Sequence, residues 1–133
     1  MSAGDLDIPA ACAVLELETD LRAYRASLTR PVPEPSSPWE RAVKRLWFKV
    51  FQMSTSNSWR DVPSAPADLA EELEGLEPRV AAVRLVARAR ARIAGRPGDA
   101  LAEAEWLTQN TERFLETPEG RERKAYLDRS LNP

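Results

Sequence analysis

Three arginine residues recur at every fourth position of one predicted helix. Arg84, Arg88 and Arg92 share a helix face because four residues make slightly more than one helical turn. Guanidinium groups about 6 Å apart along a helix could follow a phosphate backbone, which repeats negative charges. We call these three residues the arginine stripe, and they are the first candidate for a functional site.

The stripe also has a source of counter-charge within the chain. Acidic residues are frequent between Asp68 and Glu77 and again between Asp99 and Glu116. Like charges four residues apart cost about 0.2–0.5 kcal/mol per pair in an isolated helix, so the arginines need such partners. Antiparallel neighbouring helices would bring these carboxylates beside the stripe. We favour this internal pairing and keep a phosphate backbone as the alternative.

A second predicted helix, from Pro38 to about Met53, could extend the basic surface. Arg41, Arg45 and Lys49 lie on its polar face, and Phe48 lies among them. Trp59 follows in a polar loop. Aromatic side chains beside a basic face can stack on unpaired bases or anchor a protein partner. Phe48 and Trp59 are therefore candidate contact residues.

Catalytic and metal chemistry has few candidates. The chain has no histidine and one cysteine, which excludes nucleophile–histidine pairs, an intramolecular disulfide and a structural zinc site of the usual kind. Carboxylates such as Glu71, Glu72, Glu103 and Glu105 could bind Mg²⁺ or Mn²⁺, but glutamates on amphipathic helices are usually solvated. We expect a protein that is not an enzyme and binds no metal or cofactor.

Length and composition favour one folded domain. A chain of 133 residues that is 43% hydrophobic suits a single compact domain and is too apolar for a disordered protein. A net charge of -2 argues against a surface that attracts nucleic acid or anionic lipid everywhere. No apolar run approaches the roughly 20 residues of a membrane span, and no signal peptide pattern is present. We expect a cytoplasmic protein with no membrane partner.

The spacing of the apolar residues predicts an all-α fold. We expect a flexible N-terminus (1–8) and one helical domain (9–133), with a first helix (9–29), a proline-rich linker (30–37) and a helical core with a charged C-terminal helix (38–133). A short helix is expected from Ala67 to about Leu76, and Asp99 is expected to cap a later one. The whole is a small bundle of five or six helices with an antiparallel core from Ala67 to Glu116.

The helix that carries the stripe, from Pro78 to Ala94, has two apolar sides. One is formed by Ala82, Leu85, Val86, Ala89 and Ile93, and the other by Val80, Val83, Ala87, Ala91 and Ala94. An apolar side must be buried against another element, so two such sides predict a central helix with neighbours on both flanks.

The first helix has an apolar stripe of its own, formed by Val14, Leu17, Leu21, Tyr24 and Leu28. This helix either packs back onto the domain or reaches another subunit. A fully exposed stripe would be unfavourable in a monomer, so these residues are further candidates for partner binding and make a homo-oligomer a reasonable expectation.

The lack of catalytic groups and the unexplained apolar residues favour a non-catalytic interaction protein. We expect an adaptor or accessory subunit of a larger bacterial complex, whose partner is another protein or a second copy. Its contact residues would be Phe48, Trp59, Val14, Leu17, Leu21 and Tyr24. The alternative is a small helical subunit of a nucleoprotein complex, which would bind nucleic-acid backbone through Arg84, Arg88, Arg92, Arg41, Arg45 and Lys49.

Overall fold

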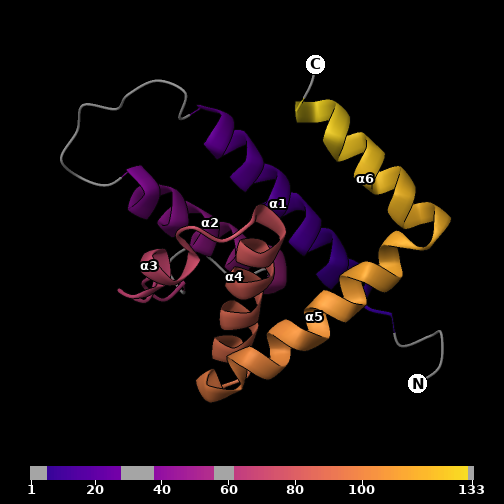
Figure 1. Cartoon of the computed structure of the whole chain (residues 1–133). Helices are drawn as coiled ribbons and strands as arrows, with labels where there is room; N and C mark the ends of the chain where they lie inside the picture. Colours follow the sequence, from indigo (N-terminus) through magenta and orange to yellow (C-terminus); the bar gives the residue numbers. More distant parts are fainter. Residues whose placement is uncertain (1–5, 28–37, 56–61, 132–133) are drawn as a thin grey trace.

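The computed structural model describes residues 6–27, 38–55 and 62–131, most of which lie in helices and none of which forms a strand. The helices are α1 (Ile8–Ser27), α2 (Pro38–Thr55), α3 (Leu69–Leu73), α4 (Pro78–Ile93), α5 (Ala100–Leu115) and α6 (Pro118–Leu131), with a 3-10 turn, η3 (Pro97–Asp99), between α4 and α5 (Figure 1). The predicted all-α class is confirmed, while the linker (30–37) lies outside the described residues. None of the described helices combines the length and apolarity that crossing a membrane requires.

Local chemistry sets several helix ends where we predicted them. Pro38 and Pro78 occupy the first positions of α2 and α4, where a missing N–H costs nothing. Gly95 follows α4 with φ +73°, and the N–H of Arg96 donates to the carbonyl of Ala91 at 2.8 Å. This is a Schellman motif, which ends the helix and turns the chain back. Thr117 caps α6, because its hydroxyl accepts the N–H of Gly120 at 3.0 Å.

Two predictions about helix ends are wrong. The side chain of Asp99 makes no capping hydrogen bond to α5, because Asp99 belongs to the η3 turn. The third helix covers only Leu69–Leu73 instead of Ala67 to Leu76. It ends early because the chain becomes extended at Glu74 and then left-handed at Gly75, where φ is +81°.

Two helices, α1 and α4, form the centre of the fold. The central position predicted for α4 is confirmed, since α4 contacts α1, α2, α3 and α5; α1 contacts α2, α4, α5 and α6. In Figure 1, α1 runs through the molecule with α2 and α4 on one side and α6 on the other. Both sides of α1 are buried, with Leu17 in the larger core cluster and Leu15 in a second cluster around Phe114.

This arrangement corrects one expectation. Val14, Leu17 and Leu21, which we expected at a partner interface, are buried in the chain's own core. The first helix therefore packs back onto the domain, because the stripe is covered by α2 and α4. Tyr24, at the end of the stripe, is only half-buried.

Ion pairs between helices show their relative directions. Glu18 in α1 pairs with Arg79 at the start of α4, whereas Asp7, just before α1, lies 3.9 Å from Arg90 near the end of α4. Arg90 also donates to Glu103 near the start of α5 at 3.1 Å. Thus α4 runs antiparallel to both α1 and α5, so the antiparallel core includes α1 as well as the region we predicted.

A polar contact fastens the beginning of α1 to α5. The buried side-chain amide of Asn110 donates to the carbonyl of Asp7 at 2.8 Å and accepts the N–H of Asp7 at 2.9 Å. The carboxylate of Asp7 in turn accepts the N–H of Ala10 at 3.0 Å and caps α1. A buried amide whose polar atoms are satisfied in this way fixes the position of the helix start.

Candidate functional site

A groove between α4 and α5 is the strongest candidate for a contact surface. It consists of two adjoining hollows of about 300 and 240 Å³, which share Arg84 and Leu101. The first hollow is also lined by Arg79, Val80, Val83, Ala104, Glu105 and Thr108; the second is also lined by Asp68, Glu72, Arg88, Pro97, Gly98 and Ala100. We call both hollows together the α4–α5 groove, which extends from the η3 turn to the middle of α5.

Two large apolar side chains that line this groove are exposed to solvent. Leu101 is 66% exposed, more than any other large apolar side chain of the described residues, and Val80 is 41% exposed. Leu101 lies off the side of α5 that Leu107 and Phe114 turn toward the core, so the fold does not bury it. Apolar surface gathered in a concave site is typical of a place where another molecule binds.

The charges of the groove are unequally paired. Arg79 is bound to Glu18, and Arg88 is bound to Glu72 at 3.2 Å and to Asp68 at 3.4 Å. Arg84 lies between them, half-buried, and makes no ion pair with any described residue. A partly buried cation without a counter-charge is less stable than a paired one, so the groove has a position that favours an incoming carboxylate.

The arginine stripe is therefore not uniform. The internal pairing that we favoured is confirmed for Arg88 only. Arg92 is exposed and, like Arg84, makes no ion pair within the described part of the chain. Among the described residues, carboxylates reach the stripe only from the short helix α3 and from Asp68 just before it, and they bind the middle arginine alone.

The basic residues of α2 also differ in their ion pairing. Lys49 binds Asp20 at 2.7 Å and Glu16 at 3.1 Å, whereas Arg45 is exposed and has no ion-pair partner among the described residues. Burial by itself lowers the pKa of Lys49, but the hydrogen bonds to Asp20 and Glu16 outweigh it, so the pKa lies above its ordinary value. Arg41 is exposed. Arg45 and Lys49 border a wide depression of about 750 Å³ between α1 and α2.

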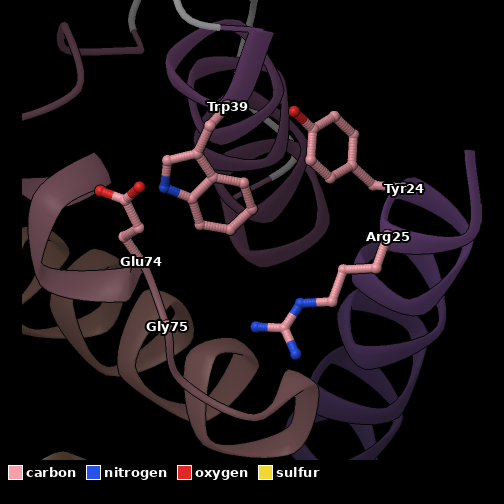
Figure 2. A pocket seen from close by; sticks show the side chains of 5 residues that line it. All are labelled: Tyr24, Arg25, Trp39, Glu74 and Gly75. Carbon is pink, nitrogen blue, oxygen red and sulfur yellow. The ribbon is translucent and has the colours of Figure 1, made fainter. Parts of the chain in front are cut away.

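A smaller hollow of about 170 Å³ lies where α1, α2 and the α3–α4 turn meet (Figure 2). The rings of Tyr24 and Trp39 are 5.6 Å apart between centroids. The indole N–H of Trp39 donates to the carbonyl of Ala70 at 2.7 Å, and the guanidinium of Arg25 donates to the carbonyl of Leu76. These polar groups are used to join the three elements, so we assign the hollow a structural role.

Two of the three aromatic residues that we predicted as contact residues lie in the described part of the chain, and their surroundings differ. Phe48 is half-buried and belongs to neither core cluster. Trp59 lies outside the described residues. Tyr24 packs against Trp39 as part of the hollow in Figure 2. Neither Phe48 nor Tyr24 lines the α4–α5 groove beside the arginine stripe.

No group of three or more cysteine or acidic side chains that could hold a metal ion occurs in residues 6–27, 38–55 and 62–131. Glu72 and Glu103, two of the carboxylates we considered as metal ligands, bind Arg88 and Arg90 instead. The thiol of Cys12 is half-buried, and burial raises its pKa above the ordinary value. A thiol with a raised pKa is protonated at neutral pH and is a weak nucleophile.

Sequence reasoning missed Val80 and Leu101 as surface residues, and it considered Glu105 only as a solvated carboxylate or metal ligand and not as part of a contact surface. We had placed Val80 on a buried side of its helix. The signal for the other two was present, since Leu101, Glu105 and Thr108 follow one another at spacings of four and three and so share a helix side apart from Leu107. That spacing marks a second side of α5 with a large apolar residue on it.

Comparison with known proteins adds no further assignment: no family model, curated protein or solved structure matches this chain.

Proposed function

We propose that this chain is a non-catalytic interaction protein, an adaptor or accessory subunit of a larger complex, and that the α4–α5 groove is its contact surface. One observation carries the proposal: Leu101, 66% exposed, stands in a hollow beside a half-buried arginine that has no ion pair within the described residues.

The energetics of these two residues support a protein partner. Burying a leucine side chain completely is worth about 1.5–3 kcal/mol relative to leaving it exposed. Arginine is enriched at the centres of protein interfaces, where its planar guanidinium binds carboxylates in two places at once. A partner that covers Leu101 and offers a carboxylate to Arg84 would gain from both effects.

Site-specific photo-cross-linking tests this proposal. A photoreactive amino acid is placed at position 101 and, as a matched control, at Arg121, which is exposed on α6. In the organism that makes the protein, we expect a discrete cross-linked product from position 101 and none of that size from position 121. The product is identified by mass spectrometry and the contact is rebuilt with purified components.

The substitution Leu101→Asp should then abolish the rebuilt contact while circular dichroism shows an unchanged helix content. Equal cross-linking from both positions, or a contact that survives Leu101→Asp, would remove the groove from the proposal.

The unpaired arginines favour one second candidate, a helical subunit that binds nucleic-acid backbone. Arg84, Arg92 and Arg45 have no ion pair with a described residue, but carboxylates lie beside Arg88 and Lys49, where they would repel phosphate. Purification without nuclease, followed by light scattering with the 260/280 nm absorbance ratio across a salt series, decides this. Nucleic acid that co-purifies with the protein, is removed by salt and is lost in the double variant Arg84→Ala and Arg92→Ala would support this candidate function. Protein that is free of nucleic acid at low salt would refute it.

A further inference from the structure

We infer that the α4–α5 groove binds the same groove of a second copy of this chain, so that the protein forms a dimer with two-fold symmetry. This inference rests on the proposed function, since it names the occupant of the same surface.

The first support is that the groove is apolar where two copies would meet most closely. Leu101 and Val80 line one hollow together with Val83 and Ala104. An interface between two identical patches is closed and needs no other surface, which is why two-fold dimers are the commonest oligomers. Stacking two copies would cover Leu101 and Val80 of both chains.

The second support is the distribution of the unpaired charges. Arg84 on α4 and Glu105 on α5 line the same hollow from opposite helices, and neither makes an ion pair within the part of the chain described. Among the described residues that line the groove, Arg84 and Glu105 are thus the two charged side chains that lack an ion pair, one a cation and the other an anion. This combination makes the surface complementary to itself.

Symmetry turns that combination into two ion pairs. If the two-fold axis runs along the groove, α4 of each copy faces α5 of the other. Residues that face each other across the groove within one chain then also face each other across the interface. Arg84 of each copy lies opposite Glu105 of the other, and the pair forms twice.

Charge also distinguishes a second copy from other occupants. An acidic helix would satisfy Arg84 but would lie against Glu105, and a basic helix would have the opposite mismatch. An occupant that fits the groove must place an anion opposite Arg84 and a cation opposite Glu105. A second copy does so by symmetry.

The size of the patch sets the expected strength. Two large apolar side chains per copy make a small interface, and small interfaces are usually weak and transient. We therefore expect a dissociation constant in the micromolar range and a dimer that forms as the concentration rises.

Sedimentation velocity of the full chain tests the inference directly. Between about 1 µM and about 1 mM, the weight-average mass should rise from that of one chain to that of two. Leu101→Asp should keep the protein monomeric throughout. Arg92→Glu is the matched control, because Arg92 belongs to the arginine stripe but does not line the groove, and this variant should dimerise like the unaltered chain.

A charge exchange tests the pairing itself. The variants Arg84→Glu and Glu105→Arg should each lose self-association at least tenfold, because each places like charges opposite each other twice. Mixing the two variants should restore the dimer as a heterodimer. In this heterodimer, position 84 of each chain carries the opposite charge to position 105 of the other chain. A fluorescent label on one variant shows whether the restored dimer contains both chains. A change in the fold of a single chain could not produce such a mixed dimer.

The outcomes separate this inference from the function on which it rests. A chain that stays monomeric at every concentration, or a dimer that Leu101→Asp leaves intact, overturns the inference. A mixture of the two charge variants that stays monomeric also overturns it. If position 101 cross-links to a different protein while the purified chain is monomeric, the proposed function stands and only self-association fails; if position 101 cross-links to nothing, both fail.

Discussion

The two long sides of α4 differ in how fully their side chains are buried and ion-paired within the fold. Toward α1, Arg79 binds Glu18, and Leu85 and Val86 are fully buried against the core. Toward the α4–α5 groove, Arg84 has no ion pair within the described residues and Val80 is 41% exposed. One side of α4 therefore stabilises the fold through buried and ion-paired side chains, whereas the other side has an exposed apolar side chain and a cation without an ion pair among the described residues. Side chains that make no such contacts within the fold are available to bind another molecule.

The largest expected effect compares two leucines on these two sides. Leu17 is buried in the core, so Leu17→Ala should lower the free energy of unfolding by about 2–5 kcal/mol. Leu101→Ala should change it by no more than about 0.5 kcal/mol, because the side chain is exposed. Urea denaturation below the concentration of any self-association measures both. A similar cost at the two positions would show that the groove is part of the core.

Two glycines offer a second matched comparison. A Cβ at Gly120 would overlap the backbone carbonyl of Phe114, whereas a Cβ at Gly98, beside the groove, meets nothing. We expect Gly120→Ala to destabilise the protein by about 1–3 kcal/mol through overpacking, and Gly98→Ala to have almost no effect. Thermal unfolding is sufficient to separate them. Equal melting temperatures for both variants would mean that α6 does not pack closely on the end of α5.

Removing one partner of an ion pair should sharpen the comparison of the arginines. Glu18 is buried, and Arg79 donates to its second oxygen at 3.4 Å as well as to its first. Glu18→Ala leaves Arg79 without its acceptor and should cost about 1.5–3 kcal/mol. Arg84→Ala removes no ion pair and should stay within about 0.5 kcal/mol. A larger loss for Arg84→Ala would contradict the idea that its charge is unused by the fold.

Within the arginine stripe the expected difference is smaller. Arg88→Ala breaks the contacts to Glu72 and Asp68, and since Asp68 is largely exposed we expect a loss of about 0.2–1 kcal/mol. Arg92→Ala should leave stability unchanged. The difference should shrink at high salt, which screens exposed charges. Salt-independent stabilities for both variants would argue against any ionic contribution from Arg88.

The smallest effect concerns pH at Asp128 of α6, which pairs with Lys124 in the same helix and with Arg22 of α1. The hydrogen bond from Lys124 holds the pKa of Asp128 below its ordinary value, with a further contribution from Arg22. A depressed pKa stabilises the fold above the unfolded value of about 3.9 and loses this contribution as the pH falls through the folded value. Asp128→Asn should therefore cost a few tenths of a kcal/mol at pH 7 and nothing near pH 2. A cost that grows on acidification would contradict the pairing.

The sequence predicted the helices well because their ends depend on neighbouring residues. Pro38, Gly95 and Thr117 act within one turn, so their roles can be read from the chain alone. Coverage by other helices cannot be read in this way. Leu17 and Leu101 are the same residue type on predicted amphipathic helices, and only the packing of α1 on α4 decides that Leu17 is buried.

The same limit explains the candidate site. Three equally spaced arginines look equivalent in sequence, but α3 is too short to reach beyond Arg88. The internal pairing was predictable in kind, since acidic segments flank α4, but not in extent. Val80 and Leu101 escaped prediction because a groove is formed by two helices together, and neither helix carries it alone.

The link between Asp7 and Asn110 has a consequence for how the chain is made. The two residues are separated by 103 positions, and α1 also packs against α5 and α6. A ribosome that has just completed α1 has not yet produced the helices that cover its second side. Until α5 and α6 have left the exit tunnel, the nascent chain must keep the apolar sides of α1 out of other contacts. We therefore expect this protein to reach its native fold late in synthesis, and to benefit from chaperones that shield its first helix.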